Sequence, residues 1–174
     1  MVPKSNKGFS LIEMLVVIML LGLLVGMLVP ALTPMISSEA RKCASQVDAL
    51  LAKGKVYAMS RSADVYIRIY EENGKIWGEH LEGTESITSE MLGNGKMSVT
   101  VTMPDGSTKY TVNATNHLYV SFHRATGALR VFGKTDNAEV VGVTTGNAQI
   151  AITAGGKTYK INIVPSTGKH EVTQ

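Results

Sequence analysis

The chain has 174 residues, of which 44% are hydrophobic and 18% charged, and its formal net charge at pH 7 is +3. This length is sufficient for one globular domain with its own core, and it argues against two. The small net charge argues against a polycation that binds nucleic acid through bulk electrostatics. Cys43 is the single cysteine, so an internal disulfide is excluded and packing must stabilise the fold.

The N-terminal part of the chain contains a long apolar block. Positions 14–38 carry no charged residue, and a helix needs only ~20 such residues to cross a bilayer. Glu13 stands directly before the block and is the only charged residue between Lys7 and Glu39. Because a carboxylate in hydrocarbon is costly, we expect Glu13 to have a function. Lys4 and Lys7 precede it without an acidic residue, which predicts a cytoplasmic N-terminus and an exported remainder.

A secretory signal peptide and a plain signal anchor are the alternatives for this block. A signal peptide would have an apolar stretch of ~7–15 residues and then a small-residue cleavage site. Here the stretch is longer, begins after Glu13 and continues through Pro30 and Pro34 into an amphipathic segment. A plain anchor gives no reason for Glu13 or for the Gly8-Phe9 junction. For Glu13 alone, the alternative is a side chain that extends toward the lipid headgroups.

A short motif spans the start of the apolar block. It reads Lys7-Gly8-Phe9-Ser10-Leu11-Ile12-Glu13-Met14-Leu15-Val16-Val17. This run resembles the class III leader of type IV prepilins and type II secretion pseudopilins. The resemblance implies that a prepilin peptidase removes residues 1–8 by cutting between Gly8 and Phe9, and that it methylates the new N-terminal residue, Phe9.

The same resemblance implies roles for three residues of the apolar helix. Glu13 is expected to be the assembly carboxylate, and Gly22 and Pro30 are expected at the helix-loosening positions. A buried carboxylate can pair with the ammonium of Phe9 on a neighbouring subunit, and such a pair sets register more than it adds stability. The implied partners are the prepilin peptidase, other pilins or pseudopilins, an inner-membrane assembly platform and membrane lipid. The implied location is the inner membrane as a single-pass protein, and then an extracellular or periplasmic filament.

Apolar residues recur at spacings of three and four after the block, which predicts that the helix continues to about residue 60. This apolar stripe consists of Ala40, Cys43, Ala44, Val47, Leu50, Leu51, Gly54 and Ala58. We therefore expect one helix over residues 9–60, with 9–36 in the membrane or filament core and 37–60 packed on a sheet. Pro30 and Pro34 predict a kink or local melting between the two halves.

From Ala63 onward the hydrophobic period changes to two, and we predict a mostly antiparallel β head over residues 61–174. Three hairpins are predicted, with turns at residues 71–74, 104–107 and 154–157. Two further strands are expected at residues 118–122 and 129–132. Residues 79–94 and 133–146 show neither period and are predicted to be surface loops. The predicted fold class is α+β, with a long N-terminal helix packed on an antiparallel sheet, and it resembles that of type IV pilins.

Two segments of the head resemble each other. Residues 123–131 and 164–172 share a Thr-Gly pair and a valine four residues after the glycine. Together with Arg61-Ser62-Ala63 after the helix, this arrangement resembles the head of H-type minor pseudopilins and FimT-like minor pilins. The resemblance implies a structural subunit, and a minor one, of a type IV pilus or a type II secretion filament.

DNA binding in an uptake pilus is the alternative function. Some FimT-like proteins bind DNA through a C-terminal Gly-Arg-x-Arg phrase, and the matching positions here are 168–171. Lys157, Lys160 and Lys169 would supply phosphate contacts that carry no sequence specificity. Glu171, however, stands where the second cation belongs, and an acidic side chain there repels phosphate.

The sequence gives little support for catalysis, for a cofactor or for a metal site. The four histidines lack metal-ligand spacing, and no nucleophile elbow or phosphate loop is present. Asp136, Asn137 and Glu139 have oxygen ligands suited to calcium, but a solvated loop is the simpler interpretation. Cys43 lies on the apolar stripe, which favours a buried side chain over a nucleophile. Asn113 begins a glycosylation-type triplet that is more simply part of a turn.

Overall fold

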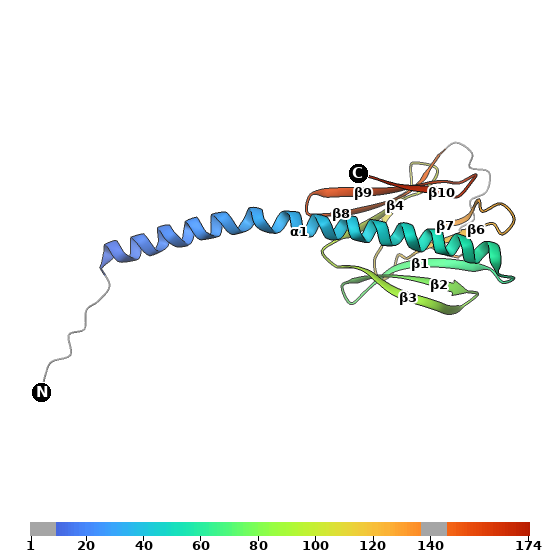
Figure 1. Cartoon of the computed structure of the whole chain (residues 1–174), viewed down its shortest axis with the longest axis horizontal. Helices are drawn as coiled ribbons and strands as arrows, with labels where there is room; N and C mark the ends of the chain where they lie inside the picture. The colour runs from blue at the N-terminus through green and yellow to red at the C-terminus, as the bar shows by residue number, and fades with distance from the viewer. Residues whose placement is uncertain (1–9, 137–145) are drawn as a thin grey trace, which may run out of the picture. The chain divides into compact units, whose positions relative to one another are not determined.

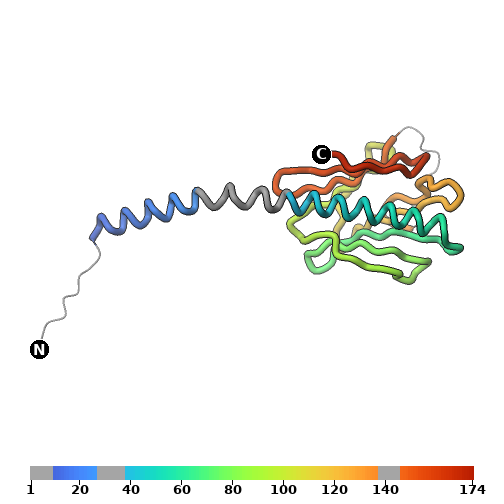
Figure 2. Tube along the Cα trace, viewed as in Figure 1, coloured from blue at the N-terminus to red at the C-terminus, as the bar shows by residue number. Residues whose placement is uncertain are grey.

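The computed structural model describes residues 10–136 and 146–174, except for the side chains of positions 27–37. As predicted, the fold is α+β: in the described part of the chain, one long helix precedes ten strands in two antiparallel sheets (Figure 1). The chain divides into two compact units, residues 1–35 and 36–174. Figure 2 traces the chain through both units.

Helix α1 spans Leu11–Ser60, close to the predicted range of 9–60. All eight residues of the apolar stripe are buried in its second half, as the spacing predicted. Cys43 is completely buried, and burial raises the pKa of its thiol to about 12, so it is not a reactive thiolate. Helix α1 continues through Pro30 and Pro34, so the expected local melting is not found. Their side chains are not described, and the expected kink stays a prediction.

The ten strands form two five-stranded sheets. Sheet 1 has the order β3 (Glu85–Asn94), β2 (Lys75–Glu82), β1 (Val65–Glu72), β6 (Leu118–Phe122) and β7 (Leu129–Gly133). Sheet 2 has the order β10 (Lys169–Thr173), β9 (Lys157–Val164), β8 (Ala148–Ala154), β4 (Ser98–Thr102) and β5 (Lys109–Thr111). The second half of α1 shares one hydrophobic core with both sheets, and Figure 1 shows it lying across them.

The three predicted hairpins are present. The β1–β2 hairpin turns at Asn73 and Gly74, whose φ angles are 52° and 69°. Two central residues with positive φ define the type I′ turn that suits the twist of a two-residue hairpin. The β8–β9 hairpin turns in the same way at Gly155 and Gly156, with φ angles of 57° and 75°. The β4–β5 hairpin turns at Asp105, whose Oδ1 accepts the backbone N–H groups of Ser107 and Thr108.

Small residues allow α1 to approach sheet 1 closely. A Cβ atom at Gly54 would overlap the side chain of Ile67 on β1. A Cβ atom at Gly78 on β2 would lie 2.7 Å from the side chains of Leu50 and Leu92. Two glycines, one on each side of the contact, therefore set the distance between the helix and the sheet.

The prediction of a loop over residues 79–94 is wrong. Strand β2 continues to Glu82, and β3 occupies Glu85–Asn94. Leu92 is the only fully buried side chain of β3, and register shifts interrupt its pairing with β2 in two places. An edge strand with a single buried side chain carries no alternating pattern, so its hydrophobic period could not reveal it.

Candidate functional site

The start of α1 presents a capping arrangement around Glu13. Ser10 precedes the first helical residue, and its carbonyl oxygen accepts the N–H of Met14 at 3.2 Å. The backbone N–H of Ser10 in turn donates to Glu13 Oε2 at 3.0 Å. A glutamate three residues after an N-cap serine is half of a capping box. Within the single chain, Glu13 therefore caps the helix by accepting the N–H of Ser10. The Ser-x-x-Glu pattern in the sequence could have predicted this role.

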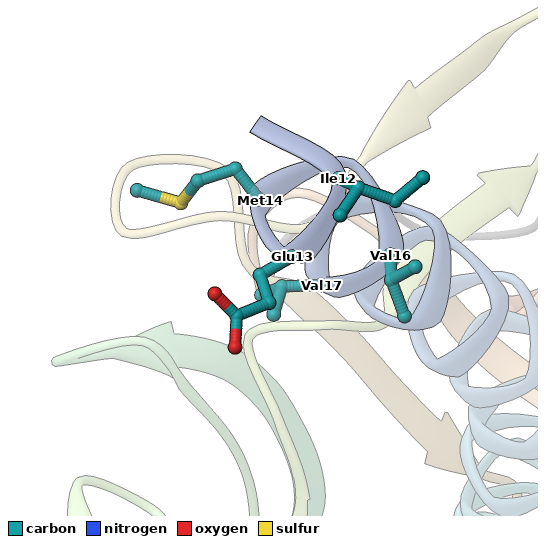
Figure 3. Close-up of a pocket in the computed structure, with 5 residues that line it drawn as sticks. All are labelled: Ile12, Glu13, Met14, Val16 and Val17. Atoms are coloured by element: carbon teal, nitrogen blue, oxygen red, sulfur yellow. The ribbon is translucent and has the colours of Figure 1, made fainter. Parts of the chain in front are cut away.

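The surface around Glu13 is apolar and exposed. The large hydrophobic side chains at positions 11–25 are 47–83% exposed. Glu13 is the only charged residue among them. Figure 3 shows Glu13 and Val17, one turn apart, on the same side of the helix. An apolar surface of this extent is rare on a soluble monomer and indicates a partner or a lipid environment.

Two glycines lie on this exposed half of the helix. A Cβ atom at Gly22 or at Gly26 would meet no other atom within 4 Å. They are spaced by four residues, as in the Gly-x-x-x-Gly pattern that lets helices in membranes approach each other closely. No role was predicted for Gly26, although its spacing from Gly22 can be read from the sequence. Gly8 and Phe9 lie outside the described residues, and the side chain of Pro30 is not described, so the roles of these three residues stay predictions.

In the part of the chain whose side chains are described, no helical segment combines the length and the apolar character required to cross a membrane.

The structure does not bring the three candidate DNA-contacting lysines together. Lys157, Lys160 and Lys169 are all exposed. Lys157 begins β9, whereas Lys169 pairs with Val164 at the other end of that strand. Seven residues of strand span ~23 Å. The lysines are therefore distributed along sheet 2 and do not form one cluster, and DNA binding through them stays a prediction.

The two segments that resemble each other fold into matching turns, residues 123–128 and 164–169, which we call the twin turns. In each, the glycine N–H donates to the carbonyl oxygen four residues earlier at 2.8 Å. The φ angles of these glycines, Gly127 and Gly168, are 68° and 60°. In each, the threonine Oγ1 accepts the N–H two residues later at 3.2 Å. The two segments are therefore similar in backbone conformation and hydrogen bonding as well as in sequence.

The twin turns meet where the two sheets join. A Cβ atom at Gly168 would overlap the carbonyl oxygen of Gly127. Next to this contact, the N–H of Leu129 in sheet 1 donates to Pro165 O at 2.8 Å. Lys55 of α1 also donates from Nζ to the backbone oxygen of the second turn's threonine at 2.9 Å. These bonds tie the helix and both sheets together at one end of the head.

His80 is a buried titratable residue that joins the helix to sheet 1. Its Nε2 lies 3.0 Å from Leu50 O on α1, and its Nδ1 lies 2.9 Å from Thr88 Oγ1 on β3. Because a carbonyl oxygen only accepts, Nε2 carries the proton, and Nδ1 of the neutral ring then accepts the threonine hydroxyl. Burial, which disfavours the imidazolium, lowers the pKa of His80, and the hydrogen bond to Leu50 opposes part of this effect.

Among the described residues, no three His, Cys, Asp or Glu side chains converge as metal ligands. Asp136 is exposed, and Asn137 and Glu139 lie outside the described residues. Asn113 Oδ1 accepts the backbone N–H groups of Thr115 and Asn116 at 2.9 and 2.7 Å. This confirms the interpretation of that triplet as turn chemistry.

Comparison with known proteins gives one match. The family model of the prokaryotic N-terminal methylation motif matches residues 3–29. No curated protein and no solved structure matches the chain. The matched segment includes the Gly8-Phe9 junction, Glu13 and Gly22. The chain therefore carries the N-terminal methylation motif that is the class III leader of the type IV prepilin and pseudopilin family.

Proposed function

We propose that this chain is a structural subunit, and a minor one, of a type IV pilus or a type II secretion filament. In this proposal, a prepilin peptidase cuts after Gly8 and methylates Phe9. The first half of α1 then packs against the same segment of neighbouring subunits. The main support is that the N-terminal methylation motif matches residues 3–29, and that within it the helix exposes its apolar side chains at positions 11–25. The minor type rests on the resemblance of the head to those of H-type minor pseudopilins and FimT-like minor pilins.

The same apolar surface suits a membrane before assembly. We expect residues 9–36 to lie in the inner membrane, with Lys4 and Lys7 on the cytoplasmic side and the head exported. Both the bilayer and the filament core remove this apolar surface from water, which is favourable by ~25 cal/mol per Å². Transfer from one to the other therefore changes the neighbours of the helix more than it changes the apolar surface exposed to water.

Glu13 is suited to set the register of this packing. Its bond with Ser10 uses Oε2, and an ionised carboxylate has about four lone-pair sites. It can therefore also accept the methylated ammonium of Phe9 from a neighbouring subunit. Desolvating both charges offsets much of their attraction, so the pair contributes alignment more than net stability. A subunit without the charge would lose that alignment while keeping its apolar surface.

Two substitutions separate this role from helix capping. Glutamine also serves as the partner at the third helical residue of a capping box, so Glu13→Gln keeps the bond to Ser10 but removes the charge. We expect Glu13→Gln and Glu13→Ala both to be cleaved and inserted normally, and both to be absent from filaments. Immunoblots of membrane and sheared-filament fractions measure this. Wild-type incorporation of Glu13→Gln would assign Glu13 to capping alone.

DNA binding has less support as a function of this head. The three candidate lysines are spread along sheet 2, and Glu171 lies beside Lys169 on the exposed strand β10. A phosphate backbone binds best to a continuous row of unpaired cations. A mobility shift with full-length protein at low salt, compared between wild type and Lys169→Ala, tests this alternative.

A further inference from the structure

The face of sheet 1 that points away from α1 carries a group of aromatic side chains. On β1, Val65, Ile67 and Ile69 are buried toward the helix, so the alternate residues lie on the opposite face. We call this opposite face the aromatic face. Its rings are those of Tyr66, Tyr70, Trp77 and Tyr119, all of which are half-buried.

The strand register fixes the positions of these rings relative to one another. Tyr70 lies directly opposite Trp77 on β2. Tyr119 on β6 lies opposite Arg68, the residue between the two tyrosines of β1. Tyr66 is four residues from Tyr70 along the strand, or ~13 Å. The guanidinium of Arg68 lies over the ring of Tyr70 at 4.7 Å and that of Arg130 over the ring of Tyr66 at 5.4 Å, so a ligand can stack on these two rings only from the opposite side.

The two arginines on this face are paired with carboxylates. Arg68 forms an ion pair with Glu79, whose side chain is almost fully buried. Arg130 Nη1 lies 3.0 Å from Asp64 Oδ2, and its Nη2 donates to the hydroxyl of Tyr66 at 3.0 Å. A polyanion gains affinity by replacing counterions at unpaired cations. A face whose arginines are already paired does not favour such a ligand and suits an uncharged one.

A hollow of about 280 Å³ lies on the same face, between β1, β6 and the β2–β3 turn. The residues that line it include Tyr66, Tyr119, Leu81, Thr84, Ser86 and the acidic Asp136, and the hydroxyl of Ser86 donates to Glu79 Oε2 at 3.2 Å. Arg68 also lines it, and the Nε of this side chain has no hydrogen-bond partner among the described residues. Ligand sites typically combine apolar and aromatic walls with a few convergent polar groups.

We infer that the aromatic face binds an uncharged saccharide chain. A pyranose ring has apolar C–H faces that stack on aromatic rings, and hydroxyl edges that exchange hydrogen bonds with hydroxyl and guanidinium groups. Those are the groups that the hollow and the neighbouring rings of Tyr70 and Trp77 present. Cross-strand pairing accounts for the neighbouring positions of Tyr70 and Trp77, but not for the hollow beside Tyr66. This inference concerns the head and does not depend on the proposed assembly through α1.

Trp77 provides a direct readout, because it is the only tryptophan of the chain and lies on the aromatic face. Full-length protein in a zwitterionic detergent without a sugar headgroup is titrated with cellohexaose, maltohexaose and chitohexaose. We expect at least one of these to change Trp77 emission saturably below about 10 mM. Tyr66→Ala should raise the Kd about tenfold or more, whereas Tyr66→Phe keeps the ring and should bind within about twofold of wild type.

The matched control is Val172→Ala, at an exposed side chain of sheet 2, which should leave the Kd unchanged. Thermal unfolding checks that every variant is folded. If Tyr66→Ala does not fold, the binding of wild type and of Tyr66→Phe still tests the inference. The inference is overturned if none of the three saccharides changes the emission. It is also overturned if dextran sulfate or DNA binds the face in their place.

Discussion

His80 shows how one side chain can couple the helix to sheet 1. Its two ring nitrogens bond to Leu50 O and to Thr88 Oγ1, and its ring lies edge-on to Tyr57 at 5.2 Å. The charged groups near it are Lys53, which disfavours the imidazolium, and Glu90, which favours it. The neutral ring satisfies both hydrogen bonds, whereas the protonated ring would direct a second donor at the Thr88 hydroxyl.

This geometry predicts that the head loses stability in acid. The folded state holds the pKa of His80 below its ordinary value of 6.5, whereas the unfolded chain titrates near that value. Below pH ~6.5 the unfolded state therefore binds more protons, and the free energy of unfolding falls by up to ~1.4 kcal/mol per pH unit. Chemical denaturation of the full-length protein in detergent, compared between about pH 7.5 and about pH 5, measures this loss.

Two variants assign the effect to its source. His80→Gln does not titrate, so it should lose less stability between the two pH values than wild type, although its lost hydrogen bonding costs ~1–3 kcal/mol at the higher pH. His117→Gln, at a half-buried histidine beside β6, is the matched control for replacing a histidine by glutamine. An unchanged pH dependence in His80→Gln would mean that other groups cause the acid sensitivity.

The turn conformation or burial of some residues could be predicted from the sequence, and His80 shows why the burial of others could not. Asn73-Gly74 and Asn113 have strong local preferences, and the burial of Cys43 followed from helical spacing. On β2, however, four consecutive residues from Gly78 to Leu81 are buried. A strand that is covered on both faces has no alternating pattern, so neither the burial of His80 nor its partners could be read from the sequence.

At the scale of elements, the twin turns bring sheet 1 and sheet 2 into contact through two glycines. Both glycines have positive φ, which residues with a Cβ rarely adopt. Gly168 has a second constraint, because a Cβ atom there would overlap the backbone oxygen of Gly127. Gly156, in the β8–β9 turn, has a φ of 75° but nothing within 4 Å of its Cβ position, so it offers a matched comparison.

We therefore predict that Gly168→Ala destabilises the head more than Gly156→Ala does. The Gly156 substitution should cost ~1–2 kcal/mol, from the left-handed backbone alone. The Gly168 substitution should cost at least ~2 kcal/mol more, because backbone must also move away. Denaturant titration of the two variants measures the difference. Equal losses would show that the twin turns do not require this close approach.

Elements with local signals were predictable, and elements that depend on distant chain segments were not. The helix to Ser60 and the three hairpins follow from spacing and from turn residues. The edge strand β3 was missed because its pairing with β2, and not its own pattern, makes it a strand. The signal for the capping role of Glu13 was present in Ser10-x-x-Glu13, but membrane chemistry offered another explanation for the same residue.

At the scale of the whole molecule, the division of the head into two sheets was not predicted. Strand β1 pairs with β6, and β4 pairs with β8, each across a long stretch of sequence. Such pairings depend on tertiary packing, on which short-range patterns carry no information. The α+β class was predictable, because the period changes once, from helical to alternating, near residue 61.

The head has the core of a stable domain, while the first half of α1 exposes its apolar side chains. The leader motif and this exposed segment together support a subunit that is processed and then buried among its neighbours. The N-terminus of the protein isolated from cells tests this account most directly. Mass spectrometry of the N-terminal peptide should find a chain that begins at N-methylated Phe9. A chain that begins at Met1, or at any other residue, would contradict it.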